Sequence, residues 1–290
     1  MSWGVPYKGS KSALVRWVVD NLPSGGRLVD LFAGGCAVTH YAMVSERWPK
    51  FLANDIDTGP ELFWCAAHGR YHDDRRWFSR EDFFRLKETD PYIKWCWSFG
   101  NDGKSYMYSR EIEPYKKAMN DVIAGRTQRE RYLAYKQAMK MLIDAPEFAS
   151  NCADRLQSLE RLESLERLER LERLERLERI ERLERLEVTR HDYRDVSLRD
   201  GDIVYCDIPY DATNAGYCKS FDREAFCRWA EAQSVPVIIS EYQLPDDRFV
   251  CVAERERTGH LCATNNSRHL TERLFVPRCQ YDDYKRRMRL

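Results

Sequence analysis

The sequence predicts an α/β fold in which a mainly parallel sheet is covered by helices on both faces. Short apolar runs typical of buried strands alternate with helical patterns in residues 1–60 and again in residues 188–290. The segment between them has a helical pattern, which indicates one α/β domain interrupted by an insertion. The 290 residues, of which 43% are hydrophobic, are enough for such a domain and its insertion.

The elements of the first segment can be placed from its apolar runs. A helical pattern covers Ser12–Asn21, and strands are expected within RLVDLFAGG (27–35) and KFLANDID (50–57). Between these two strands, AVTHYAMV (37–44) is typical of a helix. The order helix, strand, helix, strand favours parallel pairing, because parallel strands need a crossover connection.

The second segment repeats this alternation. Strands are expected within DIVYCDIPY (202–210), VPVIISEY (235–242) and RFVCVAE (248–254), and REAFCRWAEAQ (223–233) is helical in pattern. In sheets of this kind, ligands bind beyond the carboxyl ends of the strands.

The chain therefore divides into three parts: a catalytic domain from 1–60 and 188–290, an insertion at 61–150, and a repeat arm at 151–187. From Leu156 to Leu186, a leucine or isoleucine stands at every third position among Glu and Arg. These residue types favour a helix, but three residues advance only about 300°, so the leucines drift around the axis instead of forming a stripe. Two interpretations are open: a tolerated spacer, or an arm through 156–187 that flanks DNA, binds a protein partner or self-associates.

Charge places a limit on the binding surfaces of the protein. Lys plus Arg and Asp plus Glu both total 47, so the net charge is zero, whereas nucleic-acid binders are usually basic. Any basic surface must be local. The end of the chain, YKRRMRL (284–290), is one candidate, and a frayed, solvated terminus is the alternative.

Cysteine usage and hydropathy predict a soluble intracellular protein of the cytoplasm without a membrane span. The ten cysteines are scattered with no CxxC pair, and no apolar run reaches the length of a transmembrane helix. Cys65, His68 and His72 have a spacing that could suit a metal, but Gly69 weakens a helix there and no fourth ligand is nearby. We expect no metal site.

Three predicted strand ends carry residues suited to ligand binding. VDLFAGGC (29–36) runs from a strand into glycines that let the backbone approach a ligand. Asp55 follows about 20 residues later, the offset at which a carboxylate can accept hydrogen bonds from a ribose diol. VYCDIPY (204–210) ends a third strand. Together these motifs predict a nucleoside-bearing cofactor across the strand ends with a second site beside it.

The ordered series PYKGSK, DLFAGG, NDID, HDY and DIPY resembles the Dam-type DNA adenine-N6 methyltransferases. This resemblance implies the class I (Rossmann-like) methyltransferase fold, S-adenosylmethionine as methyl donor and the N6 amine of adenine in double-stranded DNA as target, in an enzyme of bacterial or phage type. A cytosine-N4 or RNA methyltransferase, or an inactive relative that binds through the repeat arm, are the alternatives.

The resemblance also assigns residues to the cofactor. Lys11 is expected to meet the methionine carboxylate, Asp55 the ribose, and Asp192 the exocyclic amine of the cofactor's adenine. The full set of cofactor residues that it implies is Tyr7, Lys11, Asp30, Phe32, Gly34, Asp55, Asp192 and Tyr193. Cys36 stands where the family has a third glycine, so the loop must turn without that freedom.

The tetrapeptide from Asp207 to Tyr210 is the expected catalytic motif. The carboxylate of Asp207 and the main-chain carbonyl of Ile208 would accept the two hydrogens of the target amine and localise its lone pair. Pro209 would shape the turn, and Tyr210 would stack on the extruded base, because chemistry on a duplex base requires flipping. Ile208 replaces the family's proline, which removes a fixed φ but keeps the carbonyl.

The insertion at 61–150 is expected to read the DNA sequence. Its loop-like centre contains glycines for bending and side chains suited to base edges or phosphates. The candidates for DNA contact are Asn101, Lys104, Tyr106 and Arg110. A solvated helical surface is the alternative interpretation.

Overall fold

The computed structural model describes residues 2–72, 74–143, 174, 177, 183–209, 221–260 and 267–289. The chain forms two units, one made of residues 1–5, 10–61 and 180–290, the other of residues 6–9 and 62–179. Most of the predicted repeat arm lies outside the described residues. Within it, Leu174 and Leu177 are helical and buried.

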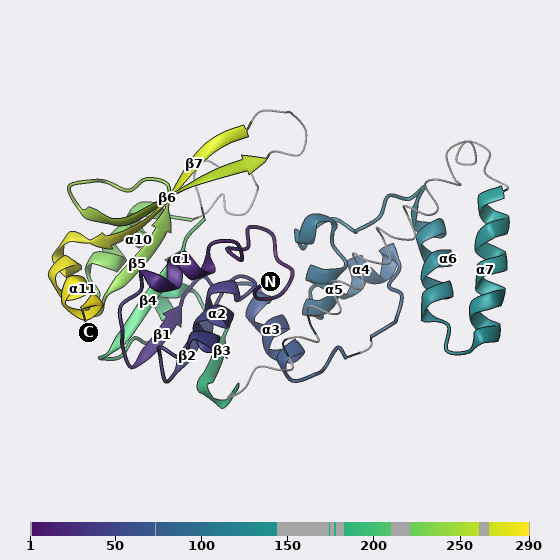
Figure 1. Cartoon of the computed structure of the whole chain (residues 1–290), viewed down its shortest axis with the longest axis horizontal. Helices are drawn as coiled ribbons and strands as arrows, with labels where there is room; N and C mark the ends of the chain where they lie inside the picture. Colours follow the sequence, from purple (N-terminus) through teal and green to yellow (C-terminus); the bar gives the residue numbers. More distant parts are fainter. Residues whose placement is uncertain are drawn as a thin grey trace. The chain divides into compact units, whose positions relative to one another are not determined.

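The first unit is built on a seven-stranded sheet with the order β3-β2-β1-β4-β5-β7-β6 (Figure 1). The five strands from β3 to β5 run parallel, whereas β7 is antiparallel to both of its neighbours. The strands are β1 (Arg27–Asp30), β2 (Phe51–Asn54), β3 (Leu186–Thr189), β4 (Asp202–Asp207), β5 (Val237–Glu241), β6 (Phe249–His260) and β7 (Ser267–Pro277). The predicted α/β class is confirmed.

Two strands were not expected from the sequence. β3 begins at Leu186, inside the last unit of the repeat, and pairs Leu186 with Phe51 of β2. A three-residue period has no strand signal, so the sequence did not indicate that residues 186 and 187 of the predicted repeat arm belong to a strand. β7 at Ser267–Pro277 was missed because its charged residues interrupt the apolar pattern.

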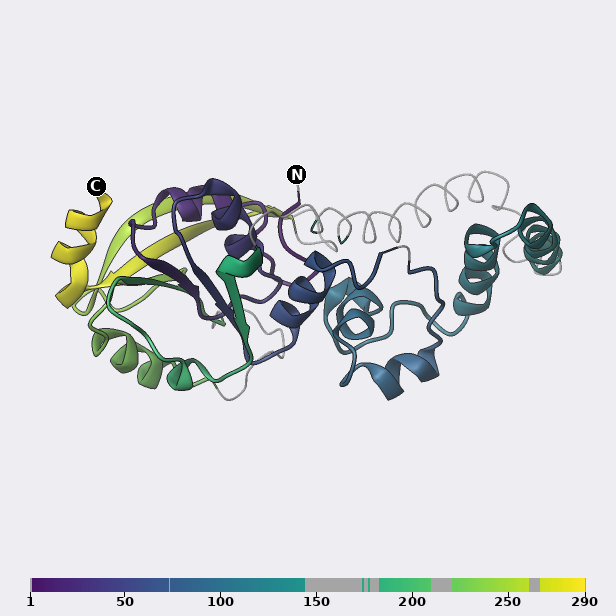
Figure 2. The ribbon, with the colours of Figure 1, turned by 90° about the horizontal axis from the view of Figure 1, so that it is seen from below.

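Helices cover both faces of the sheet (Figure 2). α1 (Val15–Asp20) and α2 (Ala37–Ser45) lie on one face, and α10 (Arg223–Glu231) lies on the other. Asp222 begins α10 by accepting a hydrogen bond from the amide of Ala225, and Phe226 is fully buried in the core. Short 3-10 turns occur at η2 (Leu183–Arg185), η3 (Tyr193–Asp195) and η4 (Arg278–Gln280).

The basic end of the chain is helical, so a frayed terminus is the wrong interpretation. α11 spans Tyr281–Met288, and the hydroxyl of Tyr284 donates to the carbonyl of Asn21 at 3.0 Å. Lys285 pairs with Asp282, while Arg287 pairs with Asp283. These local ion pairs reduce the net positive charge that the segment offers to a partner.

A buried ion pair joins the starts of β1 and β4, at the edge of the sheet opposite the strand carboxyl ends. Arg27 Nη2 lies 2.6 Å from Asp202 Oδ2, and Arg27 Nε donates to Asp202 Oδ1 at 3.0 Å. Both side chains are less than a tenth exposed. Because Arg27 and Asp202 are also register partners, the pair fixes how these two central strands align.

Removing only one member of this pair should be strongly destabilising. We expect Arg27→Met to lower the free energy of unfolding by about 3–5 kcal/mol, since it leaves a buried carboxylate without its guanidinium. Urea unfolding measures this loss. The double variant Arg27→Met/Asp202→Leu should lose less than the single variant, and an equal or larger loss would contradict the argument.

The second unit is helical and has an aromatic interior. Trp95 and Phe83 are fully buried, and the rings of Tyr71 and Tyr92 stack at 4.8 Å. Ser79 and Asp82 form a capping box at the start of its second helix. Its helices are α3 (Gly59–Ala67), which continues from the first unit, α4 (Arg80–Leu86), α5 (Pro91–Cys96), the 3-10 turn η1 (Phe99–Asn101), α6 (Glu113–Ala124) and α7 (Gln128–Ile143).

Neither unit contains a candidate membrane span in its described part. Among the residues that the structure describes, no helix combines the length and the apolar character that crossing a bilayer requires.

Candidate active site at the carboxyl ends of the strands

Four polar residues end four parallel strands of the first unit. Asp30 ends β1, Asn54 ends β2, Asp207 ends β4 and Glu241 ends β5. Because the strands are parallel neighbours, these residues meet at one edge of the sheet. Three of the four are carboxylates, so this edge is a site with a high density of negative charge.

Asn54 ties the ends of three strands together. Its amide nitrogen donates to the carbonyls of Leu31 at 3.1 Å and His191 at 3.0 Å. Its amide oxygen accepts from the hydroxyl of Thr189 at 2.9 Å and from the amide of His191 at 3.0 Å. With 1% exposure and four hydrogen bonds, Asn54 is a structural residue that holds the loops of the site in place.

The predicted glycine loop lies directly against Asp55. Gly34 has a φ of +49°, and its amide donates to Asp55 Oδ2 at 2.8 Å. The other carboxylate oxygen, Oδ1, accepts from the amide of Asp57 at 2.8 Å. Burial raises the pKa of Asp55 to about 6, although these backbone hydrogen bonds oppose the shift. Gly34 and Asp55 are thus brought together, as a shared cofactor site requires.

The N-terminal segment packs onto this loop, which sequence reasoning missed. A side chain on Gly4 would come within 2.1 Å of the carbonyl oxygen of Gly35. The amide of Val5 donates to that same oxygen at 2.8 Å, and the amide of Gly4 donates to Nδ1 of His40 at 3.1 Å. Gly4 is therefore required for the close approach of two backbone segments.

Cys36 takes the left-handed conformation that the family's glycine would adopt easily. Its φ is +57°, it begins α2, and its side chain is fully buried. Burial raises the pKa of the Cys36 thiol well above its ordinary value, so the thiol stays protonated and unreactive. The loop turns without the glycine, at the cost of backbone strain on a residue with a Cβ.

This strain predicts an unusual order of stability among variants. We expect Cys36→Gly to be more stable than Cys36→Ala by about 1 kcal/mol, because only glycine adopts a positive φ without a steric penalty. Chemical denaturation of the two variants, which both lack the thiol, compares them directly. An alanine variant as stable as the glycine variant would contradict the strained geometry.

Asp30 is buried at the end of β1, and the pKa of its carboxyl group is unusually high. The hydroxyl of Thr39 donates to its Oδ2 at 2.7 Å, whereas its buried Oδ1 accepts no hydrogen bond from any residue in the described part of the chain. Burial raises the pKa of Asp30 to about 7. The carboxylates of Asp207 and Asp55 add to the shift, and the hydrogen bond from Thr39 opposes it.

The raised pKa of Asp30 predicts how stability depends on pH. The unfolded chain releases this proton at about pH 4, but the folded protein holds it until about pH 7. Stability is therefore greatest at the acidic end of this window and falls as the pH rises, by at most about 1.4 kcal/mol per unit from this group.

The variant Asp30→Asn tests this, because it keeps an acceptor for Thr39 but does not titrate. Urea unfolding at pH 5, 6 and 7 should show a smaller decrease with pH for Asp30→Asn than for the unmodified protein. The exposed Asp200→Asn is the matched control and should keep the full decrease. Equal slopes in all three proteins would refute the raised pKa.

Lys11 contacts two carboxylates in the first unit. Its Nζ lies 3.1 Å from Asp207 Oδ1 and 3.5 Å from Glu272 Oε2, and Lys11 and Glu272 are almost completely buried. Burial alone would lower the pKa of Lys11, but the charges of Asp207 and Glu272 outweigh it and raise the pKa above its ordinary value. Lys11 was predicted to bind a cofactor carboxylate; in this structure it binds protein carboxylates.

The first three residues of the tetrapeptide lie at and just after the end of β4, and their catalytic role stays a prediction. Asp207 is the last residue of β4 and is partly exposed, and the side chain of Ile208 is 1% exposed within the hydrophobic core. Ile208 thus has a packing role that the sequence did not indicate, in addition to its carbonyl. Pro209 follows without regular secondary structure, and Tyr210 lies outside the described residues.

Two of the three aromatic residues predicted near the cofactor, Phe32 and Tyr193, lie in one cluster with Phe226. The ring of Phe32 lies 5.5 Å from Tyr193 and 5.7 Å from Phe226. Tyr193 is only 9% exposed, so its ring is mainly part of the core. Asp192 makes a two-point ion pair with Arg194, at 2.8 Å from both Nε and Nη2, and this pair lowers the pKa of Asp192. Any ligand amine would share that carboxylate with Arg194.

The remaining predicted residues belong to the second unit. The ring of Tyr7 lies 4.3 Å from that of Trp95, and a cofactor contact by Tyr7 stays a prediction. Lys104 and Arg110 are exposed. Asn101 has a φ of +55° and donates to the carbonyl of Trp95, which gives it a structural role in the turn.

Tyr106 does not fit its predicted role in DNA contact. It is 4% exposed, its ring packs near Phe83, and its hydroxyl donates to the carbonyl of Phe78 at 2.8 Å. The hydroxyl is therefore used inside the unit, and the alternating pattern of aromatic and polar residues around it concealed this burial. We remove Tyr106 from the candidate DNA-contacting residues.

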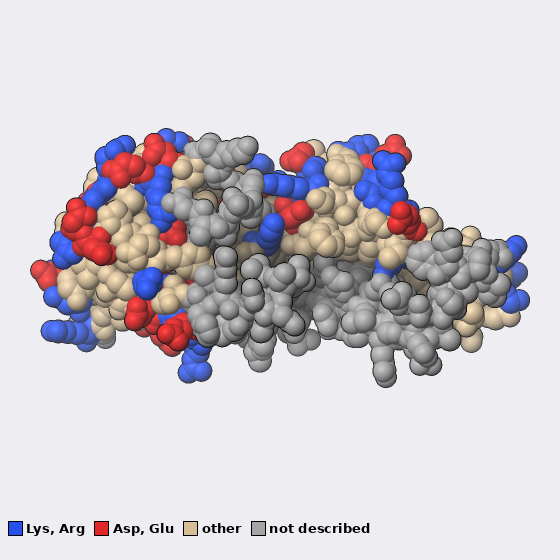
Figure 3. Space-filling model, turned by 90° about the horizontal axis from the view of Figure 1, so that it is seen from above, with Lys and Arg blue, Asp and Glu red and all other residues tan. Residues whose placement is uncertain are grey.

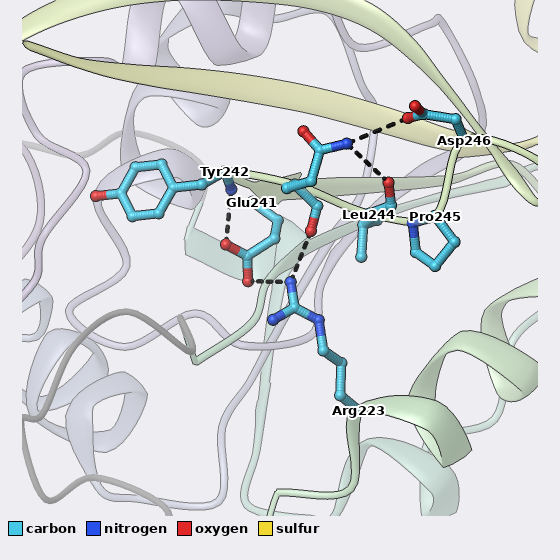
Figure 4. A pocket seen from close by; sticks show the side chains of 7 residues that line it. Arg223, Glu241, Tyr242, Leu244, Pro245 and Asp246 are labelled. Atoms are coloured by element: carbon cyan, nitrogen blue, oxygen red, sulfur yellow. Dashed lines mark hydrogen bonds and ion pairs between the residues drawn. The ribbon is translucent and has the colours of Figure 1, made fainter.

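A pocket of about 560 Å³ opens at the carboxyl end of β5, the neighbour of β4. Arg223 lies 2.8 Å from the buried carboxylate of Glu241 and donates to the carbonyl of Gln243 at 2.9 Å (Figure 4). The ring of Tyr242 points away from this ion pair. The volume is within the range of small-ligand sites, which run from roughly 300 to 1,000 Å³.

No metal centre is found in the described part of the chain. Among those residues, no cluster of three or more His, Cys, Asp or Glu side chains could hold a metal ion. Nδ1 of His68 lies 2.8 Å from the carbonyl of Trp64, and Cys65 contacts Arg70. The absence of a metal site at Cys65, His68 and His72 stays a prediction.

Strand order and strand-end residues define a class I methyltransferase fold, and comparison with known proteins gives the family. A family model described as D12 class N6 adenine-specific DNA methyltransferase matches residues 7–226, so the chain belongs to this family. The chain is also similar to the retron Ec67 DNA adenine methylase of Escherichia coli, at 24% identity over 232 residues. That match covers 75% of this chain and 66% of the relative, just under two thirds of its length.

Proposed function

We propose that this protein transfers a methyl group from S-adenosylmethionine to the N6 amine of adenine in double-stranded DNA. The position of Asp207 carries the proposal. Asp207 ends β4 and is followed by the Ile208 carbonyl, and β4 pairs with β1, whose end leads into the Gly34 loop beside Asp55. Membership of the adenine-specific family supports adenine as the target base.

The residues at the ends of β1 and β2 fit a nucleoside cofactor. Asp55 is held by backbone amides at the end of β2, where a carboxylate can accept from ribose hydroxyls. Asp30 has a buried oxygen without a described partner, which is a polar atom that a ligand can satisfy. When bound, S-adenosylmethionine supplies an electrophilic methyl group on a sulfonium.

Asp207 and Ile208 would prepare the target amine. The N6 lone pair of adenine is delocalised into the ring, so the amine is a poor nucleophile. The Asp207 carboxylate and the Ile208 carbonyl are fixed acceptors for its two hydrogens, and they favour a nitrogen with a localised lone pair. They also stabilise the positive charge that develops on nitrogen, because both oxygens carry full or partial negative charge and would lie next to it. Asp207 would receive the proton that becomes acidic as the amine is methylated.

The pocket between Arg223 and Tyr242 is our candidate for the extruded nucleotide. It lies at the end of β5, on the side of β4 away from the β1 and β2 residues assigned to the cofactor. A base flipped out of the duplex needs a cavity of its own beside the catalytic acid.

Figure 3 shows acidic and basic side chains mixed over the visible face of the first unit, which agrees with the zero net charge.

In the second unit, exposed side chains are candidates for DNA contact. Lys104 and Arg110 are both exposed and lie in or next to the loop that follows η1. A lysine ammonium suits a phosphate, and an arginine guanidinium suits a phosphate or a guanine edge. Asn101 is retained as a candidate for base contact, with its amide also used in the turn.

Methyl transfer with isotope-labelled donor and mixed-sequence DNA tests this proposal. We expect labelled N6-methyladenine by mass spectrometry of the digested nucleosides. Asp207→Asn should lower the rate by roughly 10²–10³-fold, because the amide is a neutral and weaker acceptor. Asp200→Asn, an exposed aspartate before the same strand, should keep the normal rate. Label on cytosine or on RNA only, or full activity of Asp207→Asn, would overturn the proposal.

A further inference from the structure

Glu272 is a buried carboxylate that the proposed mechanism does not use. It is 1% exposed on β7, beyond the residues that the family model matches. Its Oε2 accepts a hydrogen bond from Lys11 Nζ at 3.5 Å. Burial of an ionised carboxylate costs several kcal/mol unless a cation or hydrogen-bond donors compensate it. A buried carboxylate on a strand therefore destabilises the fold unless it has such a partner.

The ammonium of Lys11 links Glu272 to the catalytic acid. Lys11 Nζ lies 3.1 Å from Asp207 Oδ1 and 3.5 Å from Glu272 Oε2, so the two carboxylates share one cation. β7 reaches this position because it inserts antiparallel beside β5, where Arg273 is the register partner of Glu241. The strand that carries Glu272 is therefore fixed against the strands that carry the site.

Sharing the ammonium with Glu272 makes the Asp207 carboxylate a stronger hydrogen-bond acceptor. A carboxylate that holds a lysine ammonium alone is a weaker acceptor, because the ammonium withdraws negative charge from it and occupies one of its oxygens. The second carboxylate draws the ammonium toward itself and weakens that hold. Fixed in the interior, Glu272 also keeps the flexible lysine side chain in one place.

We propose that Glu272 is a positioning residue for methyl transfer, which acts by holding Lys11 between itself and Asp207 so that Asp207 remains a strong acceptor for the target amine. This inference rests on the proposed function, because it assigns Asp207 the role of accepting from that amine. Glu272 touches neither substrate nor cofactor in this account and acts through Lys11.

Several other ionisable groups lie near Lys11, Asp207 and Glu272 and contribute to the electrostatics of these three side chains. They come from β1, β4 and the end of β5: Asp30, Tyr205, Cys206 and Tyr242. Burial raises the pKa of both Tyr205 and Cys206, which keeps these two groups neutral at physiological pH. Burial raises the pKa of Asp30 to about 7, and Asp30→Asn can serve as a background in which its titration is removed.

The test compares Glu272→Gln with the unmodified protein in two measurements. In the protein without donor or DNA, carbon-13 NMR follows the titration of the Asp207 carboxyl, assigned by its loss in Asp207→Asn. We expect the midpoint for Asp207 to move to lower pH in Glu272→Gln, because a neighbouring negative charge is removed. In the methylation assay, we expect kcat to fall roughly tenfold with little change in the KM for the donor, and the acidic limb of the kcat profile to move the same way.

Two variants serve as controls. Glu254→Gln on β6 removes an exposed glutamate paired with Arg273 and should change neither measurement. Glu272→Asp keeps the charge but moves it away from Lys11 by the length of one methylene, so the Asp207 midpoint should shift less than in Glu272→Gln and part of the rate should be recovered. If Glu272→Gln does not fold, the same comparison is made with Glu272→Asp against Glu254→Asp, and a smaller shift in the same direction is expected.

The outcomes separate this inference from the proposed function. If the unmodified protein does not methylate adenine, the proposed function fails. If it methylates adenine but Glu272→Gln keeps its kcat and the Asp207 titration does not move, the inference alone fails. A rate that falls in proportion to the loss of folded protein, with an unmoved titration, would give Glu272 only a structural role and would also overturn the inference.

Discussion

The ion pair between Lys11 and Asp207 is the interaction on which the organisation of the site depends. Parallel strands bring Asp30, Asp207 and Glu241 to one edge of the sheet, and each carboxylate must be compensated there. Lys11 compensates Asp207, Arg223 compensates Glu241, and Asp30 remains protonated up to about pH 7. The three acids are therefore stabilised in different ways, and Asp207 is the one that ends β4 and leads into the DIPY tetrapeptide.

Stability and chemistry are divided between the two edges of the sheet. At the amino ends of the strands, Arg27 and Asp202 form a buried pair remote from any ligand. At the carboxyl ends, Asn54 connects the loops after β1, β2 and β3 with neutral hydrogen bonds. The first interaction fixes the register of the central strands and the second fixes the loops, so the acids between them can be arranged for function.

Much of the fold could be predicted because the strands of the first unit are short apolar runs that end on distinctive residues. DLFAGG and NDID each mark a strand end, and Gly34 and Asp55 do meet through a hydrogen bond. β3 and β7 could not be predicted, because the repeat conceals one and charged residues such as Glu272 interrupt the other. The contact between Lys11 and Glu272 joins residues 261 positions apart and depends on tertiary pairing, which no local pattern encodes. Tyr106 was predicted to contact DNA from the surface, but its side chain is buried inside the second unit. This burial also depends on tertiary contacts that no local pattern encodes.

The role of Asp207 as acceptor for the target amine is tested by a crystal structure of the protein with a DNA duplex and sinefungin, an unreactive analogue of the donor. We expect an adenine turned out of the duplex, with its N6 within about 2.7–3.2 Å of an Asp207 carboxylate oxygen and of the Ile208 carbonyl. We also expect the analogue across the ends of β1 and β2, beside Asp55. An Asp207 side chain directed away from the base, or an analogue bound elsewhere, would show that Asp207 does not prepare the amine beside a bound donor.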